Sequence, residues 1–250
     1  MKKIRISAVS YTNTTPFIYG IQHTDFINKI DLSLDIPADC AQKLIDDKAD
    51  IGLIPVAATL NMPEWHIVSD YCIGANGPVA SVFIFSNCDI HDVKYLQLDP
   101  QSRSSNNLAR VLLKNFWRIN PELIIDAKDY SLSASPDTAF VQIGDRTFGK
   151  ADKYSYVYDL AGEWQKFTGL PFVFAAWISN KPIPAGFIEE FNTILKFGLD
   201  NRPELFKELP HRDDFDIEDY LLNKIDYLLT DEKRKALHLF LIYVKDLNSQ

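Results

Sequence analysis

A short apolar run leads directly into a helix-capping turn near the start of the chain. Residues 4–10 alternate apolar and polar side chains, as a half-buried strand does. Thr12, Asn13 and Thr14 follow, whose side-chain oxygens suit helix caps, and Pro16 suits a first helical turn. Because the turn follows a strand, we expect it at the carboxyl edge of a sheet, where open α/β folds bind ligands.

The same alternation continues along the 250 residues. Further strands are expected at 32–36, 51–55, 79–85, 95–98, 139–144 and 171–178. Helices are expected between them, for example over 37–47 and 159–168. After residue 184 only helices are expected, over 187–199, 217–229 and 231–247. The pattern predicts an α/β fold with parallel strands and a helical C-terminus.

The strand–helix pattern starts anew after residue 87, which favours two lobes. We expect residues 1–86 and 183–250 to form lobe I, and residues 87–182 to form a lobe II inserted in it. A ligand cleft would then lie between the lobes.

Composition excludes several classes of protein. The net charge is −8 and the basic residues are scattered, so a nucleic-acid partner is not expected. Three widely spaced cysteines, Cys40, Cys72 and Cys88, give neither a disulfide framework nor metal-ligand spacing. The chain has no apolar stretch of membrane-spanning length and no apolar segment typical of a signal peptide. We therefore expect no metal and no membrane contact, and a cytoplasmic location; the oligomeric state stays open.

Polar turns after the strands supply the candidate ligand-binding residues. These are Ser10, Tyr11, Asn13 and Thr14 in the first turn, Gly77 and Ser81 in the second, Ser102, Arg103, Ser104 and Ser105 in the third, and Gly144 and Asp145 in the fourth. Hydroxyls, a guanidinium and helix N-terminal amides suit a carboxylate or phosphate. Alternatively each turn is purely structural, with Arg103 pairing with Asp99 to lock its loop.

These turns contain no evident general base or nucleophile. An enzyme built on them would orient an anionic, reactive substrate, or the substrate would supply its own base.

Five sequence segments form an ordered set of motifs. They begin at Ala8, Asp50, Gly77, Leu98 and Thr168, and read AVSYTNTxP, DIGLIPV, GPVxSV, LDxxSRSS and TGLPFVFAxW. Together they resemble chorismate dehydratase of the futalosine route to menaquinone. The resemblance covers roughly residues 4–180. Thr12 stands where the family usually has Leu, and Thr15 where Lys or Arg is frequent.

The resemblance implies a two-lobed fold of the type II periplasmic-binding-protein kind. It also implies a carbon–oxygen lyase that removes water from chorismate, a small dianion, to give 3-[(1-carboxyvinyl)oxy]benzoate without cofactor or metal. Our hypothesis gives one carboxylate to the third turn, including Arg103. Asn13 and Thr14, with their helix amides, hold the other carboxylate or the departing hydroxyl, and Ser81 orients the substrate.

Two alternatives share this fold. A solute-binding protein for a small anion would need export, for which no signal peptide is found. The sibling enzyme 1,4-dihydroxy-6-naphthoate synthase opens with a different turn, Ser-Pro-Asn-Asp-Thr. We therefore favour the dehydratase.

Overall fold

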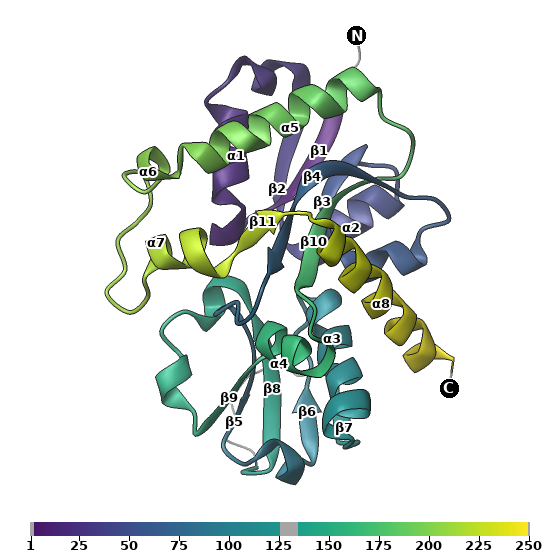
Figure 1. Cartoon of the computed structure of the whole chain (residues 1–250), viewed down its shortest axis with the longest axis vertical. Helices are drawn as coiled ribbons and strands as arrows, with labels where there is room; N and C mark the ends of the chain where they lie inside the picture. The colour runs from purple at the N-terminus through teal and green to yellow at the C-terminus, as the bar shows by residue number, and fades with distance from the viewer. Residues whose placement is uncertain (1–2, 126–134, 250) are drawn as a thin grey trace.

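The computed structural model describes residues 3–125 and 135–249. Within them the strands form two sheets, which occupy the upper and lower halves of the molecule (Figure 1). The six-stranded sheet has the order β11-β4-β10-β3-β1-β2, and the five-stranded sheet has the order β7-β6-β8-β5-β9. This is the α/β architecture that the alternating pattern predicts.

The element bounds are as follows. The six-stranded sheet contains β1 (Ile4–Val9), β2 (Ile30–Asp35), β3 (Ile51–Pro55), β4 (His66–Ala75), β10 (Phe172–Ser179) and β11 (Asp226–Leu228). The five-stranded sheet contains β5 (Val82–Ser86), β6 (Tyr95–Gln97), β7 (Glu122–Ile124), β8 (Thr138–Ile143) and β9 (Tyr156–Asp159). The helices are α1 (Thr15–Gln22), α2 (Pro37–Ile45), α3 (Ser104–Leu112), α4 (Leu160–Thr168), α5 (Ala185–Asp200), α6 (Arg202–Leu205), α7 (Ile217–Asp219) and α8 (Asp231–Asn248).

Both sheets repeat one arrangement of parallel strands. β1 pairs in parallel with β2 and β3, and β6 pairs in parallel with β7 and β8. In each sheet an antiparallel strand then pairs with a strand at one end of the parallel set: β10 pairs with β3, and β5 pairs with β8. Every residue of β3 and β10 is buried, as expected for central strands covered on both faces.

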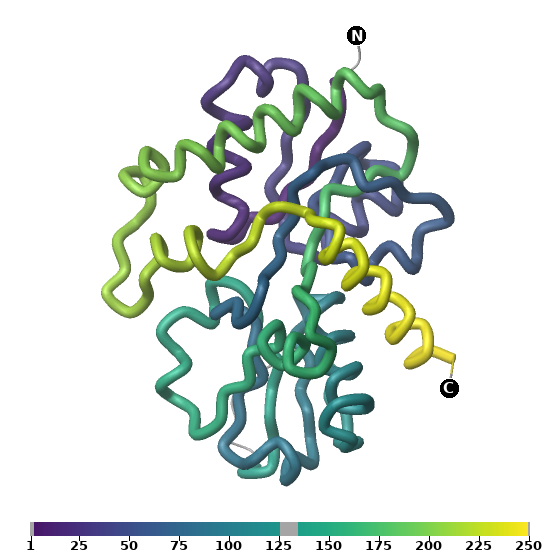
Figure 2. Tube along the Cα trace, viewed as in Figure 1, coloured from purple at the N-terminus to yellow at the C-terminus, as the bar shows by residue number. Residues whose placement is uncertain are grey.

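Two chain segments cross between the halves, the one from β4 to β5 and the one from α4 to β10, and both pass through the middle of the molecule (Figure 2). Sheet membership differs from the expected lobe boundaries at both crossings. The sequence predicts β5 in lobe I, within residues 1–86, but β5 lies in the five-stranded sheet. It predicts β10 in lobe II, within residues 87–182, but β10 lies in the six-stranded sheet. We propose that the division follows the sheets, with crossings between 75 and 82 and between 168 and 172.

Helix ends follow the chemistry of their residues. The Asp159 side chain caps α4 by accepting hydrogen bonds from the Ala161 and Gly162 N–H groups. The same helix ends at Gly169, whose φ of 74° is left-handed, as a C-terminal glycine predicts.

α1 packs on α5 through Gly20 and Gly198, where a Cβ on Gly198 would come within 1.9 Å of the Pro16 carbonyl oxygen. Only hydrogen fits there.

The prediction of nothing but helices after residue 184 is wrong. The segment predicted as a helix over 217–229 contains α7, a π-helix at Tyr220–Lys224, and the strand β11. β11 pairs with the edge of β4, and the buried Lys233 Nζ donates to the carbonyl oxygens of Asp226 and Leu228 at 2.6 and 2.7 Å. The pairing with β4 and the hydrogen bonds from the buried Lys233 outweigh the local helical pattern. α5 and α8 are helices, as predicted.

Candidate functional site

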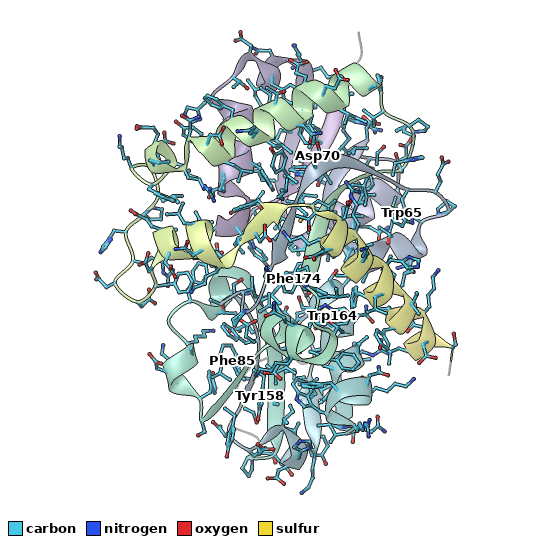
Figure 3. All side chains as sticks on the ribbon, viewed as in Figure 1. Trp65, Asp70, Phe85, Tyr158, Trp164 and Phe174 are labelled. Atoms are coloured by element: carbon cyan, nitrogen blue, oxygen red, sulfur yellow. The ribbon has the colours of Figure 1, made fainter. Side chains whose placement is uncertain are left out.

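A cavity lies where the two sheets meet, at the carboxyl ends of several parallel strands. Its volume, taken as the space that the centre of a water molecule can occupy, is about 60 Å³. The six-stranded sheet contributes lining residues from β1, β3, β4 and β10, and the five-stranded sheet from β5 and β8. Phe174 of β10 is one of them, and it lies in the middle of the molecule in Figure 3.

The cavity brings together most of the expected residues, from all four polar turns. The expected residues that line it are Tyr11, Asn13, Ser81, Ser102, Ser104, Ser105 and Gly144. The rest of the lining is apolar: Val9, Pro37, Pro55, Ile73, Val79, Val82, Ile143, Phe174 and Ala175. A mainly apolar pocket with a few convergent polar groups is typical of small-molecule sites.

The remaining expected residues lie outside this lining: Ser10, Thr14, Gly77, Arg103 and Asp145. Ser10 is exposed, whereas Thr14 is buried and donates to Asn13 Oδ1 at 3.2 Å. Arg103 reaches Gln42 Oε1 at 3.4 Å on the surface. The ion pair that the structure shows for Asp99 is with Arg146, whose Nη2 donates to Asp99 Oδ2 at 2.6 Å.

Asp145 occupies the position that we expected for a ligand anion. Its carboxylate accepts from the Thr12 N–H at 3.1 Å and from Thr12 Oγ1 at 2.9 Å. Thr12 begins a 3-10 helix over Thr12–Thr14, so the protein's own carboxylate already binds this helix N-terminus. Burial raises the pKa of Asp145, and the Thr12 hydrogen bonds oppose that rise.

Three serines from the start of α3 form one wall of the cavity, which we call the serine wall: Ser102, Ser104 and Ser105. Ser102 Oγ accepts from the Ser105 N–H at 3.0 Å, so a side-chain oxygen satisfies one main-chain N–H in the first turn of α3. Ser104 Oγ accepts from the Ala57 N–H at 3.2 Å, which ties α3 to the chain after β3. An oxygen that accepts from the main chain keeps its own hydrogen for a ligand.

Asn13 and Ser81 meet through a residue that the sequence did not reveal. Tyr220 donates from its hydroxyl to Ser81 Oγ at 2.8 Å, and Asn13 Nδ2 lies 3.4 Å from the Tyr220 hydroxyl. Tyr227 donates to the Asn13 carbonyl oxygen at 2.9 Å. We call Asn13 and Ser81, with Tyr220 behind them, the amide–hydroxyl wall. Both tyrosines are more than 130 residues from their partners, so no local pattern could have found them.

The loop that carries Ser81 is held by one carboxylate. Besides capping α4, Asp159 accepts from the Val79 and Ala80 N–H groups at 2.9 and 2.7 Å. Ala80 has a φ of 60°, a left-handed conformation that is uncommon for a residue with a Cβ. Such backbone strain is found at functional sites and needs surrounding contacts to persist.

Tyr11 contacts the turn after β8. Its ring lies against Gly144, where a Cβ would come within 2.7 Å of Tyr11 Cε2, and Gly144 has a left-handed φ of 66°. The Tyr11 hydroxyl donates to Gln101 Oε1 at 2.5 Å. Burial raises the Tyr11 pKa, and the nearby Arg146 guanidinium opposes the rise. Tyr11 therefore stays protonated at neutral pH.

Neither metal ligation nor membrane insertion is visible in the described part of the chain. Across residues 3–125 and 135–249, no three His, Cys, Asp or Glu side chains gather in a group that could hold a metal ion. In those same ranges, no helix combines the length and apolar character needed to cross a bilayer.

Comparison with known proteins gives the following matches. A family model described as menaquinone biosynthesis matches residues 4–246. Protein AF1704 of Archaeoglobus fulgidus superposes with a TM-score of 0.76 at 14% identity, covering 99% of this chain and 98% of that one. An ABC transporter structure from Parabacteroides distasonis superposes with a TM-score of 0.66 at 16% identity, covering 98% of this chain and 93% of that one.

A third match is the Candida albicans CA3427 gene product, described as having the generic periplasmic binding protein fold. It gives a TM-score of 0.63 at 10% identity, covering 100% of this chain and 95% of that one. The chain thus has a periplasmic-binding-protein-like fold, as the sequence resemblance implied.

Proposed function

This chain belongs to the menaquinone-biosynthesis family, and from that membership we propose that it converts chorismate to 3-[(1-carboxyvinyl)oxy]benzoate in the central cavity. The reaction is a dehydration, which makes the protein a carbon–oxygen lyase. Fold likeness alone would fit a solute-binding protein equally well, so the proposal rests on the family and on the chemistry of the cavity.

The observation that carries the proposal is the nature of the cavity lining. Its polar groups are hydroxyls and an amide, and Tyr11 is its single ionisable side chain among the described residues. Because burial raises the Tyr11 pKa, this phenol is a poor base at neutral pH. The arrangement suits a substrate that carries its own base and needs mainly to be oriented.

Chorismate meets that requirement. Its enolpyruvyl carboxylate takes the proton from the ring carbon that bears the ether oxygen. The electron pair of that C–H bond forms the double bond that completes the aromatic ring, and the C–O bond to the neighbouring hydroxyl breaks. The hydroxyl leaves as water after taking up the proton that the carboxyl group now holds.

Each wall has a role in this step. The serine wall and the N-terminus of α3 bind the ring carboxylate, since hydroxyls and unpaired helix N–H groups both donate to anions. The amide–hydroxyl wall faces the departing hydroxyl, where a hydrogen bond from Ser81 stabilises the charge that develops on oxygen. Arg103 has no part in this assignment because it reaches Gln42 instead.

Incubation of the purified protein with chorismate tests the proposal. We expect an aromatic product lighter than chorismate by one water, identified by chromatography and mass spectrometry. Binding of chorismate without turnover would favour a solute-binding protein. Formation of 1,4-dihydroxy-6-naphthoate from its own precursor, with chorismate unchanged, would identify the sibling enzyme instead.

A further inference from the structure

The C-terminal segment supplies a side chain that links the two expected catalytic residues. Tyr220 begins the π-helix at Tyr220–Lys224 and is 1% exposed. Its hydroxyl lies 2.8 Å from Ser81 Oγ and 3.4 Å from Asn13 Nδ2. Asn13 precedes α1 in the upper half, whereas Ser81 immediately precedes β5 of the five-stranded sheet. One buried phenol thus bridges groups that approach the cavity from different sheets.

The Tyr220 ring is held on its other side by aromatic contacts. The rings of Phe148 and Phe215 lie 5.3 and 5.4 Å from it, both at steep angles. Phe148 and Phe215 stack on each other, with centroids 3.8 Å apart and planes 9° apart. Phe148 follows β8, and Phe215 comes from the segment before α7, so both halves of the molecule fix this ring. Edge-to-face and stacked pairs restrict the directions in which a ring can move.

The hydrogen bonds also have a direction. Asn13 Nδ2 can only donate, so the Tyr220 hydroxyl oxygen accepts the hydrogen bond from it. The Tyr220 hydroxyl then donates its own hydrogen to Ser81 Oγ. Ser81 is thereby an acceptor on its Tyr220 side, which leaves its own hydrogen available to the cavity that it lines. Burial raises the Tyr220 pKa well above its usual range, so the hydroxyl keeps this donor role at neutral and mildly alkaline pH.

We infer that Tyr220 is a positioning residue for the dehydration, acting through Ser81 and Asn13 without touching the substrate. This inference rests on the proposed function. Tyr220 fixes the Ser81 hydroxyl as a donor aimed at the departing oxygen and holds the Asn13 amide in register with it. The C-terminal segment is therefore part of the catalytic arrangement, although none of the five resembling sequence motifs lies in it.

Steady-state kinetics of Tyr220→Phe test this role, because the variant loses one oxygen and keeps the packed ring. We expect kcat for chorismate to fall about 10- to 100-fold, with KM within about threefold of the parent protein, since misplacement of a reacting group affects turnover more than binding. Tyr158→Phe is the matched control. Tyr158 also accepts a hydrogen bond, from the Ile90 N–H at 2.8 Å, but lies low in the other half of the molecule (Figure 3). We expect it to keep kcat within about twofold.

A double-mutant cycle separates positioning from general loosening. In a Ser81→Ala background, Tyr220→Phe has only the Asn13 amide left to position, so we expect a further loss of kcat that is clearly smaller than the loss in the parent background. 3-Fluorotyrosine at position 220 keeps the ring and the hydroxyl, so we expect it to retain kcat within about threefold. This protein also tests the role of Tyr220 if the Tyr220→Phe variant does not fold.

The outcomes are distinct. A parent protein that fails to turn over chorismate overturns the proposed function, and this inference with it. An active parent whose Tyr220→Phe variant keeps kcat within twofold overturns the inference alone. Equal losses in the parent and Ser81→Ala backgrounds do the same, because the part of the effect that passes through Ser81 is absent when Ser81 is replaced. Loss of kcat in the fluorotyrosine protein also overturns it.

Discussion

The two polar walls of the cavity are built in different ways. In the serine wall, hydroxyls accept from main-chain N–H groups, Ser102 from Ser105 and Ser104 from Ala57. In the amide–hydroxyl wall, side chains bond to side chains that lie 139 and 207 residues away. A wall supported by main chain keeps its geometry when a distant side chain changes. In a wall held by hydrogen bonds between side chains, the polar groups are more sharply oriented, but the change of one side chain disturbs them more easily.

The largest effect is expected in the amide–hydroxyl wall. Asn13→Ala and Ser81→Ala should each lower kcat about 10²- to 10³-fold, as removal of one hydrogen-bond donor to developing negative charge does. Kinetics with chorismate measure the loss, and thermal melting checks that the fold is kept. Unchanged turnover in both variants would contradict the assignment of these residues.

Gly144→Ala is expected to come next. Its Cβ would push against the Tyr11 ring, and the left-handed φ of Gly144 disfavours any side chain. Because the Gly144 N–H also donates to the Ser81 carbonyl oxygen at 2.8 Å, the displacement reaches the same wall. We expect kcat/KM to fall about 10-fold and stability by about 1 kcal/mol, by kinetics and urea unfolding. A variant with parental values would show that this turn adapts freely.

The serine wall should respond mainly in binding. Ser102→Ala or Ser104→Ala removes one donor to a carboxylate, which we expect to raise KM about 5- to 10-fold and to change kcat by less than about threefold. The split between KM and kcat is the measurement. If these variants lose kcat as Ser81→Ala does, the two walls do not differ in role.

Arg103→Ala should have a smaller effect. The side chain bonds to Gln42 at the surface, so kcat/KM should stay within about twofold of the parent value. A rise in KM of about 10-fold or more would return Arg103 to the site and contradict its position in the structure.

The smallest response is expected from pH. Neither wall has a group that titrates near neutrality, and the Tyr11 pKa is raised, so the protonated phenol persists above its usual range. We expect kcat to stay level between about pH 6.5 and pH 9. A clear pKa within that range, read from a kcat–pH profile, would indicate a protein base that this assignment omits.

Sequence patterns anticipated the serine wall better than its counterpart. The serines belong to one polar turn that leads into a helix, and Ser102 bonds to Ser105 only three residues away. Strand β3 has the bounds expected of its apolar run, Ile51–Pro55. Asn13 and Ser81 were identified from their turns and from the family resemblance, yet nothing local joins them to each other.

The rest depended on long-range contacts. Tyr220 lies in a stretch with a helical pattern, which the pairing of β11 with β4 and the contacts of the buried Lys233 interrupt. Asp145 was expected to meet a ligand, but its reach to Thr12 across 133 residues follows from how the two sheets are placed. Local spacing cannot report such contacts.

The single carboxylate of Asp159 has a mechanical consequence. Four main-chain N–H groups converge on it, two from the start of α4 and two from the loop before Ser81. Helix and loop therefore share one anchor, and any tilt of α4 is transmitted to the Ser81 hydroxyl. Asp159 lies outside the cavity lining and yet positions Ser81, which lines it. Substitutions on the side of α4 that faces away from the cavity are therefore expected to change turnover.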